Sequence, residues 1–405
     1  MQNSLNFNII FAPIFLAAVY REFFGGLDIV SLGGLSISFF EIAILFLIYM
    51  FFCVGKKATL LACDFVILFP LALYAFNSFR GVFYDSDGFM YSLKAGIYFY
   101  IVAVAGIFLR ENIDAQNTLF CFIRYSALLL AIISILRSFF GADLLYYGFH
   151  DDDLGINDGN RSLTSAGAFL IGLSIICGVI FDGLKNKVNN TLFAFLFFGL
   201  VLSKQGTAII ASICALCFLI FSQALLKNSS LIFKIIFFII FISFAVILLG
   251  QFFSFDFYRF FGDVNQREAN LELRKKIWDG FEYSYKTWNW FDKLFGFPVG
   301  VKPDVYVDWW GGVYWEHSYH SMYYGGVYMV GLFGLMSLAA YPFFVLVKIL
   351  FAHSNYYTIK KFVAIFSLVI FAFVYSYGYE LKAESGLLFA LISIIEFWKF
   401  GEKNE

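Results

Sequence analysis

Apolar runs of about 20 residues, the length of helix that crosses a bilayer, recur along almost the whole chain. Most of the polar connections between these runs are short, and one is much longer than the rest. Hydrophobic residues make up 61% and aromatic residues 22% of the 405 residues, which is more apolar surface than one soluble core can bury. We therefore predict an all-α, polytopic membrane protein and exclude a soluble globular enzyme.

The apolar runs predict about twelve membrane-spanning helices. Lysine and arginine residues lie in alternate connections between the runs, as at Lys56, Arg110 and Lys187. The positive-inside rule places these connections in the cytoplasm, so both termini are expected there. The predicted spans lie near residues 6–20, 37–55, 58–79, 92–109, 118–138, 163–182, 190–203, 207–225, 230–250, 325–348, 360–378 and 385–399.

One long polar segment divides the spans into two groups. Residues 1–250 hold the first nine predicted helices, residues 325–405 hold the last three, and residues 251–324 form a large loop between them. The loop lies opposite the lysine-rich connections, so we expect it on the external, periplasmic side of the membrane. It is long enough to form a small extramembrane subdomain.

The loop at residues 251–324 combines tryptophan with basic residues. Aromatic faces stack against the apolar faces of sugar rings, and guanidinium groups bind phosphate oxygens through two hydrogen bonds. This mixture suits a phosphorylated or lipid-linked saccharide. For any single tryptophan the alternative is a belt that anchors the loop at the depth of the lipid headgroups. The residues are Trp278, Trp288, Trp290, Trp309, Trp310, Trp315, Arg259, Arg267, Arg274, Lys275 and Lys276.

A spaced motif closes the loop and opens the next span. His320 and Ser321 are followed, after nine residues, by Gly331 and, after two more, by Gly334. The pattern H-[N/S/Q]-x9-G-x2-[G/T/Y] resembles that of the O-antigen ligase and O-antigen polymerase superfamily, whose members assemble bacterial surface polysaccharides. Close helix packing is the alternative reason for the glycines.

The loop and the topology also resemble this superfamily. Arg274 and Trp278, followed by residues 294–300, are similar to its loop signature. A dozen or so spans with one large periplasmic loop late in the chain are also similar to its layout.

Two stretches between the earlier spans extend the resemblance. Arg161, ten residues and then Gly172 are similar to a motif of the polymerases of this group. The turn at residues 203–207 stands where the superfamily has a turn rich in serine and arginine. Lys204 takes the place of the usual arginine, which keeps the positive charge but removes two-point binding of phosphate.

The resemblance implies transfer of a glycan from a polyprenyl diphosphate to an acceptor hydroxyl. The acceptor must lose a proton, for which a histidine with a pKa of about 6.5 is suited, and cations must neutralise the departing diphosphate. We predict that His320 is the base and that His317 orients it. Arg274, Lys204 and Arg161 are expected to bind the diphosphate. Arg267 and Trp278 are expected to make supporting contacts with the substrate.

Other roles are open for several of these residues. The displacement needs no nucleotide, redox cofactor or metal, because the diphosphate already activates the anomeric carbon, and it is expected to invert the configuration. His317 and His320 are nevertheless spaced as two ligands of a metal, with Glu316 and Asp308 close in sequence. For the basic residues, the alternatives to diphosphate binding are a solvated run of charges on the surface and a contact with lipid headgroups.

We expect a membrane glycosyltransferase that polymerises O-antigen or exopolysaccharide repeat units, because Arg161 and Gly172 match the polymerase pattern. A ligase that transfers the glycan to lipid A-core is the first alternative. The second is a transporter or flippase, which would show an internal repeat and ionisable groups near the bilayer midplane. The expected partners are an undecaprenyl-diphosphate-linked oligosaccharide, the lipid bilayer, and a chain-length regulator or another assembly protein, without nucleic acid.

A few ionisable residues lie inside predicted spans. Asp64 in the third span and Arg124 in the fifth stand at similar distances from the cytoplasmic ends. Burial of either charge alone is costly, so we expect the two side chains to pair with each other.

Overall fold

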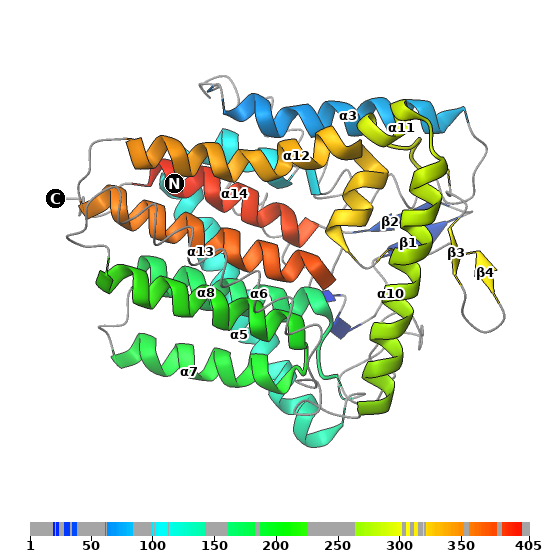
Figure 1. Ribbon diagram of the computed structural model, residues 1–405. Coiled ribbons are helices and arrows are strands. Elements are labelled where there is room, and N and C mark those ends of the chain that lie inside the picture. The colour runs from blue at the N-terminus through cyan, green and yellow to red at the C-terminus, as the bar shows by residue number, and fades with distance from the viewer. Residues whose placement is uncertain are drawn as a thin grey trace.

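The computed structural model of the protein describes residues 19–20, 22–23, 28–32, 35–38, 61, 63–83, 99–100, 102–111, 113–141, 144, 161–182, 187–225, 264–301, 305–307, 312–314, 319, 321–351, 356–378 and 383–398. Almost all of these residues are helical (Figure 1). The prediction of an all-α fold is therefore confirmed.

Most of the helices lie side by side in a bundle (Figure 1). The long helix α10 (Val264–Thr287) instead crosses one end of this bundle, and the short helix α11 (Trp290–Phe295) follows it beside α3. Residues 102–109 form a further helical segment. The helices of the bundle are α3 (Asp64–Val82), α5 (Ile113–Phe140), α6 (Ser165–Phe181), α7 (Lys187–Leu202), α8 (Gly206–Leu225), α12 (Met322–Phe351), α13 (Tyr356–Gly378) and α14 (Ala383–Phe397).

Two short antiparallel hairpins supply the strands of the described part. The first pairs β1 (Asp28–Leu32) with β2 (Leu35–Ser38). The second pairs β3 (Tyr306–Val307) with β4 (Val313–Tyr314) and belongs to the predicted loop. It packs closely on α10, because a Cβ atom on Gly280 would come within 3.0 Å of the carbonyl oxygen of Tyr306.

The described residues include helices that are long and apolar enough to cross a membrane, which supports the prediction of a membrane protein. Within the described residues these are Asp64–Val82, Gln116–Phe140, Met322–Phe351 and Tyr357–Ser376. Shorter apolar helices occupy Ser165–Phe181, Asn189–Leu202, Gly206–Ser222 and Ser385–Phe397. The predicted spans near 6–20, 37–55 and 230–250 lie outside the described residues, apart from a few residues at their ends.

Helix α6 forms the centre of the bundle, with nearly every residue from Ala166 to Ile180 buried. Small residues allow its neighbours to approach closely, as is usual where helices pack inside membranes. A Cβ atom on Gly172 would come within 3.0 Å of the Ser212 hydroxyl on α8 and would crowd Phe371 on α13. Gly172 therefore has a packing role at a junction of three helices.

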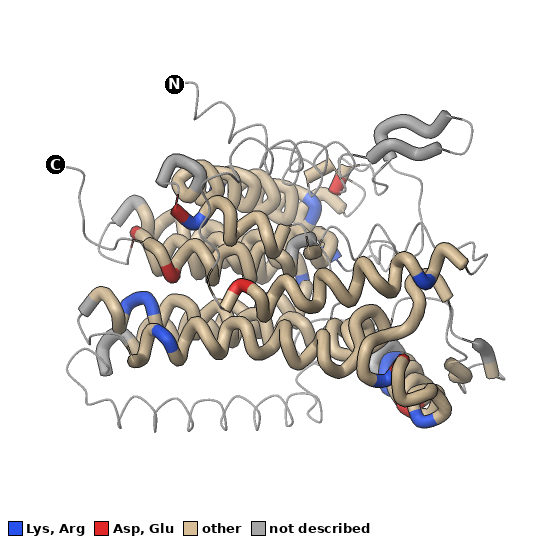
Figure 2. The backbone as a smooth tube through the Cα atoms, turned by 90° about the horizontal axis from the view of Figure 1, so that it is seen from above, with Lys and Arg blue, Asp and Glu red and all other residues tan. Residues whose placement is uncertain are grey.

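Charged residues of the described helices gather mostly toward the two ends of the bundle, as Figure 2 shows. Two ion pairs among the described residues are buried completely, and one of them joins Asp64 and Arg110. The guanidinium group of Arg110 donates to both carboxylate oxygens of Asp64, at 2.7 Å and 2.8 Å, and neither side chain is exposed. Two-point hydrogen bonding of this kind compensates the cost of taking both charges out of water.

The predicted pairing of Asp64 with Arg124 is therefore wrong. Arg124 instead forms an ion pair with Asp182, at the end of α6, and both side chains are partly exposed. The turn after residues 102–109 brings Arg110 to the first residue of α3, which is Asp64. The sequence placed Arg110 in a polar connection, where its burial was not expected.

Candidate functional site

Helix α12 is broken at Gly331, the first glycine of the spaced motif. Gly331 has φ 68° and ψ −178°, a conformation that is open to glycine and strained for other residues. Figure 1 shows the sharp bend that results between the start of α12 and its long remainder. The break separates a short helical segment, which begins at Met322, two residues after the predicted base, from the rest of the span.

The backbone of α11 packs directly against this break. A Cβ atom on Gly331 would come within 3.0 Å of the carbonyl group of Leu294 and the amide nitrogen of Phe295. The backbone N–H of Phe297 donates to the carbonyl oxygen of Tyr328 at 2.7 Å, which satisfies an acceptor that the break leaves without a helical partner. The stretch at residues 294–300 and the glycine motif, separate in the sequence, thus meet in one place.

Two polar residues near the end of α3 hold this junction together. The side-chain amide of Asn77 donates to the carbonyl oxygens of Phe295 at 2.6 Å and Met329 at 3.0 Å. The backbone carbonyl oxygen of Asn77 accepts a bond from the backbone N–H of Val299 at 3.0 Å. Asn77 therefore joins α3, the α11 loop and the broken helix.

Arg80, one turn further along α3, adds a charged contact to the same junction. Its guanidinium group donates to the carbonyl oxygen of Gly296 at 2.8 Å and forms an ion pair with Asp292 of α11 at 2.5 Å. Neither Asn77 nor Arg80 was predicted from the sequence to belong to the site. The sequence did contain a sign of their role, because an amide and a guanidinium group stand at the end of an apolar run, where polar side chains can bind a loop.

Trp278 on α10 supports the backbone directly before His320. Its ring is 8% exposed and its indole N–H donates to the carbonyl oxygen of Tyr319 at 2.9 Å. The ring also stacks on Tyr324 of α12, with centroids 5.6 Å apart and planes at 18°. Trp278 thus holds the chain on both sides of His320.

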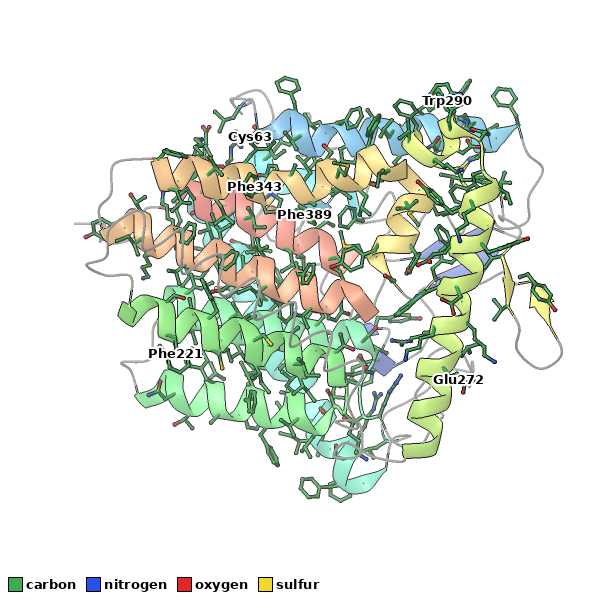
Figure 3. All side chains as sticks on the ribbon, viewed as in Figure 1. Cys63, Phe221, Glu272, Trp290, Phe343 and Phe389 are labelled. Atoms are coloured by element: carbon green, nitrogen blue, oxygen red, sulfur yellow. The ribbon has the colours of Figure 1, made fainter. Side chains whose placement is uncertain are left out.

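The loop tryptophans that are described differ in exposure. Trp288, like Trp278, is 8% exposed and packs against Phe281 and Phe297. Trp290 is 69% exposed and stands at the edge of the molecule where α11 lies beside α3 (Figure 3). Its ring is therefore accessible to a sugar or to the lipid headgroup region.

The segments that carry Arg161 and Lys204 lie against each other at the end of the bundle that α10 crosses. The Ser162 hydroxyl donates to the carbonyl oxygen of Leu202 at 2.9 Å. The side-chain amide of Gln205 donates to the carbonyl oxygen of Leu163 at 2.8 Å. Two of the predicted cations are thus carried by neighbouring turns.

Lys204 has a backbone conformation that is uncommon for a side-chain-bearing residue. Its φ of 56° is the only positive value among the described residues other than glycine. Strain of this order, about 1–3 kcal/mol, is found at functional sites more often than elsewhere. The conformation turns the chain sharply between α7 and α8.

The remaining predicted cations lie on α10. Arg274 is half-buried at the middle of the helix, whereas Lys275 is exposed and Lys276 forms an i,i+4 ion pair with Glu272 at 3.5 Å. Arg267 lies in the first turns of α10, and its side chain is outside the described residues. Because α10 crosses the end of the bundle where Lys204 lies, these cations are on one side of the molecule (Figure 1).

The two predicted histidines, His317 and His320, lie outside the described residues, as do Asp308 and Glu316. The metal alternative therefore stays a prediction. Within the described ranges, no group of three or more His, Cys, Asp and Glu side chains is placed to hold a metal ion.

Comparisons of the chain with protein families, with curated proteins and with solved structures found no significant match.

Proposed function

We propose that this protein is a glycosyltransferase of a bacterial inner membrane that uses a polyprenyl-diphosphate-linked glycan as donor and polymerises repeat units at the periplasmic face. The proposed topology has about twelve membrane spans and a periplasmic loop at residues 251–324. One observation carries it furthest. The loop stretch at residues 294–300 docks on the break at Gly331, which lies eleven residues after His320 in the chain.

A broken helix needs compensation inside a membrane, because no water is present to bind its freed backbone groups. Phe297 and Asn77 supply these bonds at Tyr328 and Met329. The result is a hydrogen-bonded join between the loop and the bundle, and Tyr319, the residue before His320 in the chain, packs on Tyr328 at this join. Support of this kind is what a catalytic side chain requires for a fixed geometry.

In the proposed reaction, an acceptor hydroxyl attacks the anomeric carbon of the donor. The new glycosidic bond forms as the bond to the diphosphate oxygen breaks, so that polyprenyl diphosphate leaves and the configuration inverts. His320 takes the proton of the hydroxyl. Arg274, Lys204 and Arg161 stabilise the negative charge on the departing diphosphate.

Fewer observations support the choice between the two acceptors, a lipid-linked repeat unit and lipid A-core. Gly172, one end of the polymerase-like pattern, is explained by packing against α8 and α13. Arg161 is the part that supports polymerisation rather than ligation to lipid A-core. Transport of a lipid-linked glycan is the remaining candidate, and the broken helix is the observation that favours it.

A deletion strain separates these activities through the banding pattern of its surface polysaccharide. Loss of the ladder with one repeat unit still attached to lipid A-core supports a polymerase. Loss of all attachment, with accumulated lipid-linked polymer, supports a ligase. Accumulation of single lipid-linked units on the cytoplasmic side supports a flippase and contradicts the glycosyltransferase assignment.

A further inference from the structure

The segment that carries Arg161 rests on a completely buried ion pair. Glu22 and Arg137 lie 3.2 Å apart, and neither side chain is exposed. Glu22 belongs to a short helical segment early in the chain, and Arg137 lies near the end of α5. Neither residue has a part in the chemistry proposed above.

Glu22 holds the start of α6. The backbone N–H of Thr164 donates to both carboxylate oxygens of Glu22, at 2.9 Å and 3.2 Å, and the Thr164 hydroxyl donates to one of them. Thr164 is the N-cap of α6, since its hydroxyl accepts a bond from the N–H of Gly167. The carboxylate therefore lies at the positive end of a helix dipole, where negative charge is stabilised.

Arg137 holds the same segment from the other side. Its guanidinium group donates to the carbonyl oxygens of Ser162 at 3.2 Å, of Leu144 at 3.0 Å and of Glu22 itself. The backbone is thus fixed at residues 162 and 164, immediately after Arg161.

The network continues to the turn that carries Lys204. Ser134 on α5 lies 2.7 Å from the Ser162 hydroxyl and donates to the carbonyl oxygen of Gly199 at 2.8 Å. Ser162 in turn bonds Leu202, as described above. One buried polar network therefore connects the ion pair to both cation-bearing turns.

Stability alone does not explain a buried ion pair at this place. The desolvation of two charges is costly, and well-packed apolar residues of similar volume are often at least as stabilising. An ion pair offers something that apolar residues lack, because it fixes several backbone groups at defined positions through directional hydrogen bonds. Here these groups belong to Thr164 and Ser162.

We propose that Glu22 and Arg137 are positioning residues, which fix the turns of Arg161 and Lys204 in the arrangement that binds the diphosphate of the lipid-linked donor. This inference rests on the proposed function. It adds a role for two residues that do not touch the substrate.

The test compares binding of undecaprenyl diphosphate to purified wild-type protein and to variants in detergent. Arg137→Lys keeps the charge but lacks the planar fork that bonds several acceptors together, and we expect it to weaken binding about tenfold or more. Ser162→Ala is a milder variant that removes one of the two hydrogen bonds between the turns, since the bond from Gln205 to Leu163 remains, and we expect a smaller weakening in the same direction. Asp64→Asn is the matched control, because it breaks an equally buried pair elsewhere in the bundle.

The outcomes are distinct. Weaker binding in Arg137→Lys and Ser162→Ala, with unchanged binding in folded Asp64→Asn, supports the positioning role. Equal affinity in all variants, or equal loss in the control, overturns it, and so does a wild-type protein that does not bind the diphosphate. Binding by a wild-type protein that makes no polymer contradicts the proposed reaction but leaves the positioning role in place.

Discussion

The side-chain amide of Asn77 donates a hydrogen bond to the carbonyl oxygen of Met329, although 252 residues separate the two in the chain. Met329 lies two residues before the break at Gly331. The bond therefore ties the end of α3 to the point where α12 changes direction. Because Asn77 also bonds Phe295, a single side chain connects three segments of the proposed site.

Replacement of Asn77 by leucine should destabilise the protein. The change leaves the carbonyl oxygens of Phe295 and Met329 without this donor, at a cost of about 1–3 kcal/mol for each unsatisfied group. We expect a lower midpoint of thermal unfolding and reduced polymer formation. Ser78→Ala is the control, because the Ser78 hydroxyl bonds only Tyr74 of the same helix among the contacts described here. Equal unfolding midpoints for the two variants would contradict the role of Asn77.

Replacement of Gly331 by alanine should prevent normal docking of α11. The substitution forces a side chain into φ 68° and places its Cβ within 3.0 Å of the Leu294 backbone. We expect little folded protein after membrane extraction, measured by size-exclusion chromatography. Gly206→Ala should behave like wild type, since nothing lies within 4 Å of a Cβ there. A well-folded, active Gly331→Ala protein would show that the break is not required.

A double-mutant cycle tests the buried pair of Asp64 and Arg110. Asp64→Asn alone should lower the unfolding midpoint, because it leaves the Arg110 charge buried without its counter-ion. Adding Arg110→Gln should recover part of the loss. The combination of Asp64→Asn with Arg124→Gln should instead be additive, since Arg124 pairs with Asp182. Coupling to Arg124 rather than Arg110 would refute the observed pairing.

The shape of the cations should matter as well as their charge. Arg274→Lys removes a planar fork that binds phosphate through two bonds, so we expect it to reduce turnover clearly. Lys204→Arg adds such a fork and should be tolerated or increase donor use. Polymer formation from a defined polyprenyl-diphosphate donor measures both variants. Small and equal effects of the two variants would indicate that Arg274 and Lys204 are ordinary surface charges that do not bind the diphosphate.

Much of the bundle could be predicted from apolar length alone, because the length of a spanning helix is set by the bilayer. The predicted spans near 163–182 and 207–225 coincide closely with α6 and α8. The partners of buried charges could not be predicted in the same way. The predicted span at 58–79 placed Asp64 inside a helix, whereas Asp64 is the first residue of α3, and only the packing of several helices brings Arg110 beside it.

The candidate site, like the bundle, could be predicted only in part from the sequence. The glycine motif was visible in the sequence, whereas its reason, a contact between Gly331 and the backbone of Leu294, depends on folding. Trp278 was predicted to bind substrate, and the structure adds a second task, support of Tyr319. Glu22 and Arg137 were missed because they are 115 residues apart and neither belongs to a recognisable motif.

The most direct measurement is polymer formation by purified protein from an undecaprenyl-diphosphate-linked repeat unit, with His320→Ala beside the wild type. We predict polymer from the wild type, and a rate lower by about 10²–10⁴-fold in His320→Ala with unchanged folding, as expected on loss of a general base. His353→Ala, in a connection predicted to be cytoplasmic, should match the wild type. Equal rates for His320→Ala and wild type, or a folded wild type that makes no polymer, would contradict the account.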